Sequence, residues 1–140
     1  MLKVLLVDDD HEEAELFTAA LKSVNESIGF VHAQDCVNLL DTIRKHKPDI
    51  VFIDINMPFL NGIECLKSVR RDLEFKSLPI IMYSTSNNQK NIIDSFNNNA
   101  NLYIVKPDSY KGIIIALEKV LKVNWAIEPR PLLRDFVLAS

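Results

Sequence analysis

Five short apolar runs alternate with five helical patterns along this chain, and this alternation limits the fold more than any other feature. A strand followed by a helix, repeated five times, predicts parallel strands joined by crossover helices that cover both faces of a sheet. We therefore predict a doubly wound α/β fold with a five-stranded parallel sheet in the order 2-1-3-4-5. The predicted strands are Val4–Val7, Phe30–Ala33, Ile50–Ile53, Pro79–Tyr83 and Leu102–Val105, and the helical patterns run over 17–24, 39–43, 63–69, 92–96 and 113–121.

The composition changes at Asn124, after the last helical pattern, and Pro129 and Pro131 prevent a simple helical continuation. A chain of 140 residues fits one compact domain. We predict one domain over residues 1–123 and a C-terminal tail over 124–140 with no room for a DNA-binding or catalytic output domain. The apolar residues of the tail indicate contact with protein. Three alternatives stay open: packing on the same domain, a homodimer arm, or a docking element for another protein.

Composition and charge argue against several other classes of protein. The formal net charge is −3 and the pI is about 5.6, so the chain lacks the basic surface that nucleic-acid binding requires. The apolar stretch before Asp8 is too short for a signal peptide or a membrane span, which predicts a cytoplasmic protein. Cys36 and Cys65 lack metal-ligand spacing, and we expect two reduced thiols without a role.

Carboxylates stand at the ends of two predicted strands. Asp8, Asp9 and Asp10 follow the first strand, and Asp54 ends the third. In the predicted strand order these ends are neighbours, and two carboxylates about 5 Å apart repel each other by roughly 3 kcal/mol at an effective dielectric constant near 20. A divalent cation relieves this repulsion, and Mg²⁺ commonly combines one or two carboxylates with water and phosphate oxygens. The alternative for Asp8, Asp9 and Asp10 is that they only begin a helix, a role that suits Asp10 best.

Groups that bind phosphate follow two further strands. Ser84-Thr85-Ser86 comes after the fourth strand, and Lys106-Pro107 comes after the fifth. A hydroxyl and an ammonium group together hold the oxygens of a phosphoryl group. Each signal alone is weak, but combined with two acidic strand ends they indicate a Mg²⁺ and phosphoryl site.

These residues resemble the response-regulator receiver family, the CheY-like domains, which share a flavodoxin-like fold. The resemblance covers residues 1 to about 123. Thr85 and Asp108 depart from the family pattern, in which a smaller residue and an aromatic residue are common. The motifs that carry the resemblance are Leu5-Leu6-Val7-Asp8-Asp9, Asp54-Ile55-Asn56-Met57-Pro58, Gly62, Ser84 and Lys106-Pro107.

The resemblance implies a role for each site residue. Asp54 accepts the phosphoryl group from a sensor histidine kinase, a histidine phosphotransfer protein or a small acyl phosphate. Asp8, Asp9, Asp54 and the backbone carbonyl of Asn56 hold Mg²⁺. Lys106 neutralises a phosphoryl oxygen, and its bond to Pro107 is expected to be cis.

The resemblance also implies a switch. Ser84 moves toward the phosphoryl group, Tyr103 changes rotamer, and the face formed by the fourth helix, fifth strand and fifth helix binds an unknown downstream protein. The resemblance therefore implies that the protein is a stand-alone response regulator and not an enzyme.

Three other functions share parts of this pattern. A small Mg²⁺-dependent phosphatase of the haloacid-dehalogenase type also uses an Asp nucleophile, but it usually carries a second Asp two positions later, where Asn56 stands. A flavin carrier of the same fold needs a Ser-, Thr- and Gly-rich loop after the first strand, where three carboxylates stand. An interaction module that is never phosphorylated would not need the complete set of site residues.

Overall fold

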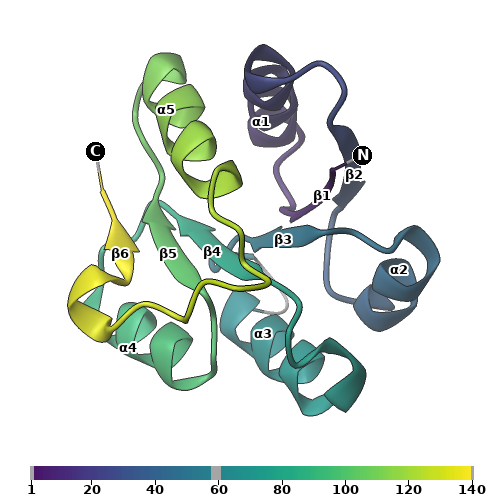
Figure 1. The fold of residues 1–140 in the computed structure, drawn as a ribbon, viewed down its shortest axis with the longest axis vertical. Helices are drawn as coiled ribbons and strands as arrows, with labels where there is room; N and C mark the ends of the chain where they lie inside the picture. Colours follow the sequence, from purple (N-terminus) through teal and green to yellow (C-terminus); the bar gives the residue numbers. More distant parts are fainter. Residues whose placement is uncertain (1, 58–60, 140) are drawn as a thin grey trace.

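The computed structural model describes residues 2–57 and 61–139, and it shows the predicted alternation of strands and helices (Figure 1). Each predicted strand is present to within one residue at either end. In chain order the elements are β1 (Lys3–Val7), α1 (His11–Val24), β2 (Gly29–Ala33), α2 (Leu39–His46), β3 (Ile50–Ile53), α3 (Gly62–Arg71), β4 (Ile80–Ser84), α4 (Gln89–Asn97), β5 (Leu102–Val105), α5 (Tyr110–Leu121) and β6 (Val137–Leu138), with 3₁₀ turns at Leu73–Phe75 and Leu133–Asp135.

The strands form one parallel sheet in the order β2-β1-β3-β4-β5-β6. The predicted order 2-1-3-4-5 is confirmed, but the prediction of five strands is wrong because β6 extends the sheet beyond β5. Two residues between irregular segments show no alternation of apolar and polar positions, so the sequence pattern did not reveal this strand.

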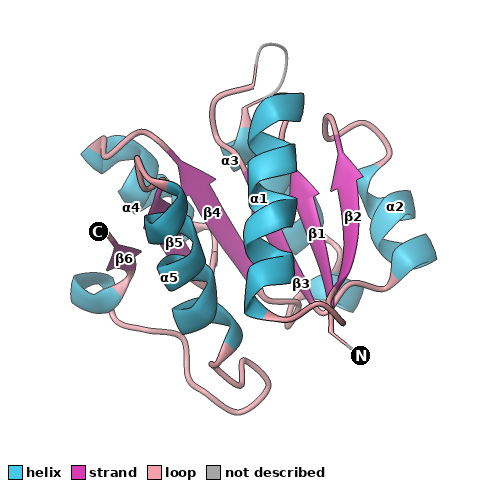
Figure 2. Cartoon of the chain, turned by 90° about the horizontal axis from the view of Figure 1, so that it is seen from above, coloured by secondary structure: helices cyan, strands magenta, loops and turns pink. Residues whose placement is uncertain are grey.

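Helices cover both faces of the sheet (Figure 2). On one face, α1 and α5 pack over a core that contains Val4 and Leu6 of β1. On the other face, α2, α3 and α4 pack over Leu5 and Val7 of the same strand. Because successive residues of a strand point to opposite faces, the continuous apolar run of β1 supplies both cores.

The C-terminal segment packs on the same domain, which was one of the three alternatives. Phe136 is fully buried, and its ring lies 5.2 Å from that of Phe96 in α4. Arg130 stacks over Phe96 at 4.0 Å and donates a hydrogen bond to the Phe96 carbonyl. The Trp125 indole donates to the carbonyl of Val120 at the end of α5. The segment thus contacts both helices that flank β5.

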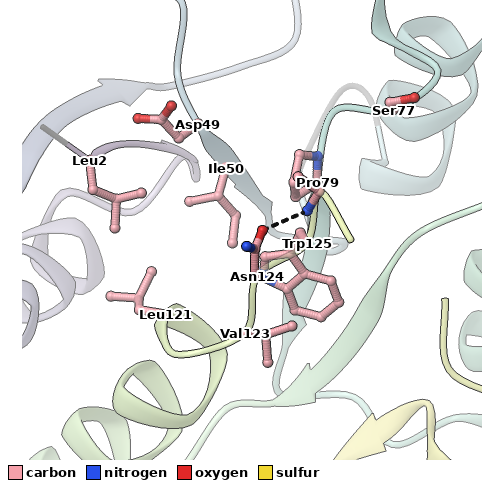
Figure 3. Close-up of a pocket in the computed structure, with 10 residues that line it drawn as sticks. Leu2, Asp49, Ile50, Ser77, Pro79, Leu121, Val123, Asn124 and Trp125 are labelled. Carbon is pink, nitrogen blue, oxygen red and sulfur yellow. Dashed lines mark hydrogen bonds between the residues drawn. The ribbon is translucent and has the colours of Figure 1, made fainter. Parts of the chain in front are cut away.

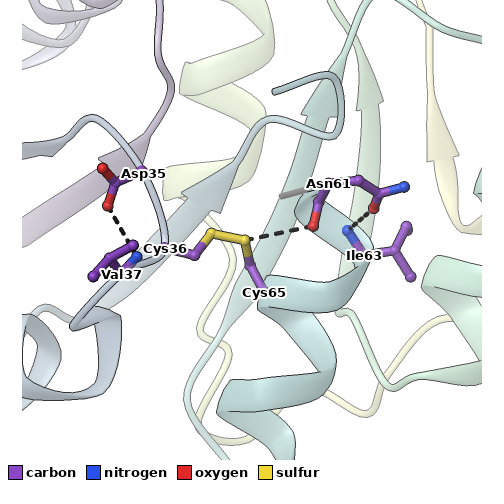
Figure 4. Close-up of a disulfide and its surroundings, with 6 residues drawn as sticks. All are labelled: Asp35, Cys36, Val37, Asn61, Ile63 and Cys65. Carbon is purple, nitrogen blue, oxygen red and sulfur yellow. Dashed lines mark hydrogen bonds between the residues drawn. A yellow bond between two sulfur atoms is a disulfide. The ribbon is translucent and has the colours of Figure 1, made fainter. Parts of the chain in front are cut away.

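The two cysteines form a disulfide, so the expectation of two reduced thiols is wrong (Figure 4). Cys36 lies in the loop after β2, and Cys65 lies in α3 on the same face of the sheet. Their Cα atoms are 5.8 Å apart, which is within the usual range for a disulfide. A separation of 29 residues gave no sign of this contact, because it arises from the packing of the loop against α3.

A cavity of about 300 Å³ opens at the amino ends of the strands (Figure 3). Leu2 and Pro79, the residues before β1 and β4, line it together with Leu121 and Trp125 from the C-terminal part of the chain. It lies at the opposite end of the sheet from Asp8, Asp9 and Asp54, which follow the carboxyl ends of β1 and β3. Among the described residues, no helix combines the length and the apolar character needed to cross a membrane.

Candidate functional site

Three carboxylates meet at the carboxyl ends of β1 and β3. One oxygen from each of Asp8, Asp9 and Asp54 lies within 4.8 Å of the other two. The pairing of β1 with β3 brings them together, and the Asp54 N–H donates to the Val7 carbonyl at 2.9 Å. Asp8 and Asp54 are buried, whereas Asp9 is exposed. Oxygen donors at this spacing fit a hard divalent cation.

Asp10 begins helix α1, as expected, and takes no part in this cluster. Its side chain accepts hydrogen bonds from the backbone N–H groups of Glu12 and Glu13. Its own N–H donates to Asp8 Oδ1 at 2.9 Å. Asp10 therefore caps α1, and neither Asp9 nor Asp8 Oδ2 takes part in the cap.

Burial makes the charged form of two carboxylates unfavourable. Removal from water raises the pKa of Asp54 to about 6, against an opposing effect of the Lys106 ammonium and with a further increase from the Asp8 charge. Burial also raises the pKa of Asp8, although the Asp10 N–H and Lys106 counteract it. A cation bound between these groups would stabilise their charged forms.

Lys106 is the positive group of the site. Its ammonium lies 3.3 Å from Asp8 Oδ2 and 3.6 Å from Asp54 Oδ1, and it sits 5.2 Å from the centre of the Tyr83 ring. It also contacts Glu13 Oε2, from the first turn of α1. Only 8% of the Lys106 side chain is exposed, so these carboxylates replace most of its water.

Ser84 ends β4 next to β3 and is fully buried. Its Oγ accepts hydrogen bonds from the Asn56 side-chain amide at 3.3 Å and from the Ser86 N–H at 3.1 Å. The Asn56 backbone N–H in turn points to Asp54 Oδ1 at 3.4 Å. Hydrogen bonds thus connect the carboxylate of Asp54 to Ser84 through one intervening residue.

Tyr103 is buried, and its hydroxyl donates to the Ser86 carbonyl at 2.6 Å. Burial raises the pKa of Tyr103, while its contacts with Ser84 and Ser86 act in the opposite direction. The side chain therefore occupies an inward position beside the segment that follows Ser84.

Gly62 allows helix α3 to begin directly behind the acidic loop. A Cβ atom at this position would lie 2.1 Å from the Asp54 carbonyl oxygen. The Gly62 N–H donates to the Ile55 carbonyl at 2.9 Å, and the Asn61 side chain caps the helix by accepting from the Ile63 N–H. Residue 62 thus has to be glycine for reasons of space.

The structure corrects the expected isomer of the Lys106–Pro107 bond, and it does not describe Pro58. The bond between Lys106 and Pro107 is trans, not cis, as are the other peptide bonds of the described residues. The trans isomer is intrinsically favoured for X-Pro bonds. With the trans isomer, the Lys106 N–H donates a hydrogen bond of 2.7 Å to the Ser84 carbonyl. Pro58, part of the acidic motif, lies outside the described residues.

Sequence reasoning missed Glu13. Its position in the first helical turn after Asp8 to Asp10 was the available signal, but acidic residues there are common because they favour the helix terminus. Only the tertiary structure, in which α1 packs against α5 on one face of the sheet, shows that the Glu13 carboxylate meets Lys106.

Comparison with known proteins defines the class of this chain. The sequence profile of the response regulator receiver domain matches residues 4–118. Chemotaxis protein CheY-3 of Vibrio cholerae is 32% identical over 124 residues, covering 86% of this chain and 92% of the relative.

Solved structures share the fold. The phosphorylated cyanobacterial phytochrome response regulator RcpA superposes with a TM-score of 0.80 at 23% identity, covering 94% of this chain and 99% of that one. The Mn²⁺-bound form of response regulator Rcp1 superposes with a TM-score of 0.76 at 19% identity, covering 94% and 100%.

The chain therefore belongs to the response regulator receiver domain family, whose members act in two-component signalling. The alternative of a haloacid-dehalogenase-type phosphatase has no support, because the matched relatives are signalling proteins and Asn56 replaces the second Asp of that motif.

Proposed function

We propose that this protein is a response regulator whose Asp54 accepts a phosphoryl group from a histidine kinase or a histidine phosphotransfer protein. A carboxylate oxygen of Asp54 bonds to phosphorus as the bond between phosphorus and the donor histidine nitrogen breaks, and the electron pair leaves with that nitrogen. The observation that carries the proposal is the meeting of Asp54, two further carboxylates and Lys106 at one edge of the sheet.

The donor set fits Mg²⁺. Asp8, Asp9, Asp54 and the backbone carbonyl of Asn56 would hold the ion, which when bound neutralises charge on the transferring phosphoryl group. The Mn²⁺-bound form of Rcp1 supports a divalent cation in a protein of this fold. Lys106 would hold a phosphoryl oxygen, and Ser84 would donate its hydroxyl to another.

Ser84 and Tyr103 are the groups that we assign to the switch. Phosphorylation makes the site more negative by about one charge and adds acceptor oxygens. A Ser84 hydroxyl drawn to the phosphoryl group would leave its contact with the Ser86 N–H, next to the carbonyl that holds the Tyr103 hydroxyl. A change at this point alters the surface of α4, β5 and α5, which we assign to binding of a downstream protein.

In this structure β6 lies along the edge of β5, and therefore the surface of α4, β5 and α5 includes the C-terminal segment.

We also propose that the C-terminal segment takes part in a homodimer, because Ile127 and Leu132 remain 77% and 61% exposed. Sedimentation equilibrium would test this: a Leu132→Asp variant should have the mass of one chain where the wild type has that of two. A wild type that is monomeric throughout would reject the dimer.

Intact-mass spectrometry after incubation with acetyl phosphate and Mg²⁺ tests phosphoryl acceptance. We expect a labile adduct of about 80 Da that depends on both Asp54 and the metal ion. The Asp54→Ala variant and wild type in EDTA are the controls. A wild type that remains unmodified by acetyl phosphate and by phosphoramidate would argue against acceptance from small donors, and an unmodified protein after incubation with active histidine kinases would reject the function.

A further inference from the structure

Glu13 is a third carboxylate partner of the Lys106 ammonium, beside Asp8 and Asp54. It belongs to α1, whereas the residues assigned to phosphoryl acceptance lie at strand ends. Its backbone is fixed, because its N–H donates to the capping carboxylate of Asp10 at 3.2 Å. Its side chain therefore reaches Lys106 from a rigid helical turn.

The partners of Lys106 differ in how readily they can release it. The Asp8 side chain is fully buried and held at its other oxygen by the Asp10 N–H. The Glu13 side chain is 37% exposed and has one more rotatable bond. It also borders a cavity of about 160 Å³ that Tyr83 and Thr85 help to line. Glu13 therefore has both space and water available if it leaves the ammonium.

A phosphoryl group on Asp54 would need the same ammonium. The wild-type site already places the carboxylates of Asp8, Asp54 and Glu13 around Lys106. A phosphorylated Asp54 adds about one negative charge and would compete with Glu13 for the Lys106 N–H donors. The phosphoryl group and the Glu13 carboxylate would also repel each other, since both are negative.

We propose that Glu13 is a positioning residue that holds Lys106 in the unphosphorylated protein and must release it when the aspartyl phosphate forms. This inference rests on the proposed function of Asp54. Glu13 thereby slows uptake of the phosphoryl group and shortens the lifetime of the phosphorylated state, since it competes with that group for the Lys106 ammonium.

The test compares Glu13→Gln, Glu13→Asp and wild type, with Glu12→Gln as the matched control. Glu12 is exposed in the same helical turn, its N–H is held by the same cap, and within the described structure its carboxylate makes no ion pair with Lys106. Acetyl phosphate with Mg²⁺ is the phosphodonor. Intact mass gives the uptake rate at a series of donor concentrations, and the decay rate after the donor is removed.

Glu13→Gln should take up the phosphoryl group roughly 3- to 10-fold faster at limiting donor and lose it several-fold more slowly, because a neutral amide competes less for an ammonium. Glu13→Asp, which keeps the charge, should return toward wild-type values. Glu12→Gln should match wild type. Urea unfolding of each variant shows whether the change is confined to the site, since a loss of folding would slow uptake and not accelerate it.

The outcomes separate this inference from the proposed function. If wild type and Glu12→Gln form no adduct with acetyl phosphate or a histidine kinase, phosphoryl acceptance itself fails. If they form it and Glu13→Gln behaves as Glu12→Gln does, or takes up the group more slowly, the role of Glu13 is overturned while the function of Asp54 stands.

Discussion

The backbone N–H of Tyr103 donates a hydrogen bond of 3.0 Å to the carbonyl of Phe136, and their rings lie 6.5 Å apart. A residue of the central fold and a residue 33 positions later thus share one buried cluster. The C-terminal segment is therefore part of the core, and the aromatic residue assigned to the switch is in direct contact with it.

Replacing Phe136 with Ala should lower the free energy of unfolding by about 3 to 5 kcal/mol, because the change leaves a cavity between Phe96 and Tyr103. Leu133→Ala is the control, since that side chain is 42% exposed and should cost much less. Urea denaturation measures both. Equal losses for the two variants would show that Phe136 is not buried in solution.

The stability of the metal-free protein should fall as pH rises from about 4 to about 6. The pKa of Asp54 is about 6 in the folded protein against an ordinary value of 3.8, so the folded state binds more protons in this window. The loss is of the order of 3 kcal/mol at most and remains above pH 6. Urea denaturation in EDTA at several pH values measures it.

Asp54→Asn removes this titrating group. Its free energy of unfolding should exceed that of wild type by about 1 to 3 kcal/mol at pH 8, and the difference should nearly vanish at pH 3.5. Asp8, whose pKa is also raised, contributes in the same direction in both proteins. Parallel pH profiles for the two proteins would contradict the assignment to Asp54.

Mg²⁺ should stabilise the folded protein through the acidic cluster. At a concentration about 100-fold above the dissociation constant, binding adds about 2.7 kcal/mol to the free energy of unfolding. Asp9→Asn should weaken this effect with little change in the metal-free protein, because Asp9 is exposed. Glu26→Gln, an exposed acidic residue elsewhere, is the control and should respond to Mg²⁺ as wild type does. Thermal unfolding across a Mg²⁺ titration provides the measurement.

Gly62→Ala should destabilise the protein by about 1 to 3 kcal/mol, because the added Cβ would overlap the Asp54 carbonyl. It should also slow phosphoryl uptake, since the Asp54 loop has to move. Gly29→Ala is the matched control: the nearest atom to its Cβ would be 3.6 Å away. The free energy of unfolding and the adduct mass would be compared for both variants, and a neutral Gly62→Ala would disprove the close approach.

Reduction of the disulfide should lower the free energy of unfolding by about 3 kcal/mol, because the Cys36–Cys65 bond closes a loop of about 30 residues in the unfolded chain. Thiol titration of the unfolded protein before and after reduction counts the free cysteines. A Cys36→Ser variant is the control, because reduction should leave its stability unchanged. Two free thiols in protein prepared without reductant would contradict the pairing.

The amino-acid sequence by itself determined the alternation of strands and helices, the order of the first five strands and the meeting of Asp8, Asp9 and Asp54 with Lys106. The strands and helices follow from sequence because their patterns are local, and the strand order is the one typical of the fold that the motifs resemble. In that order the carboxyl ends of the parallel strands lie at one edge, which brings the site residues together. The role of each residue at that edge stays a prediction, and the experiments above test it.

Tertiary structure alone decided the Cys36–Cys65 bond, the addition of β6 to the sheet and the contact of Glu13 with Lys106. None of these has a periodic or local signature. Each depends on which side chains the packed helices and loops bring within a few Å of each other, and that is settled by the burial of apolar surface across the whole domain.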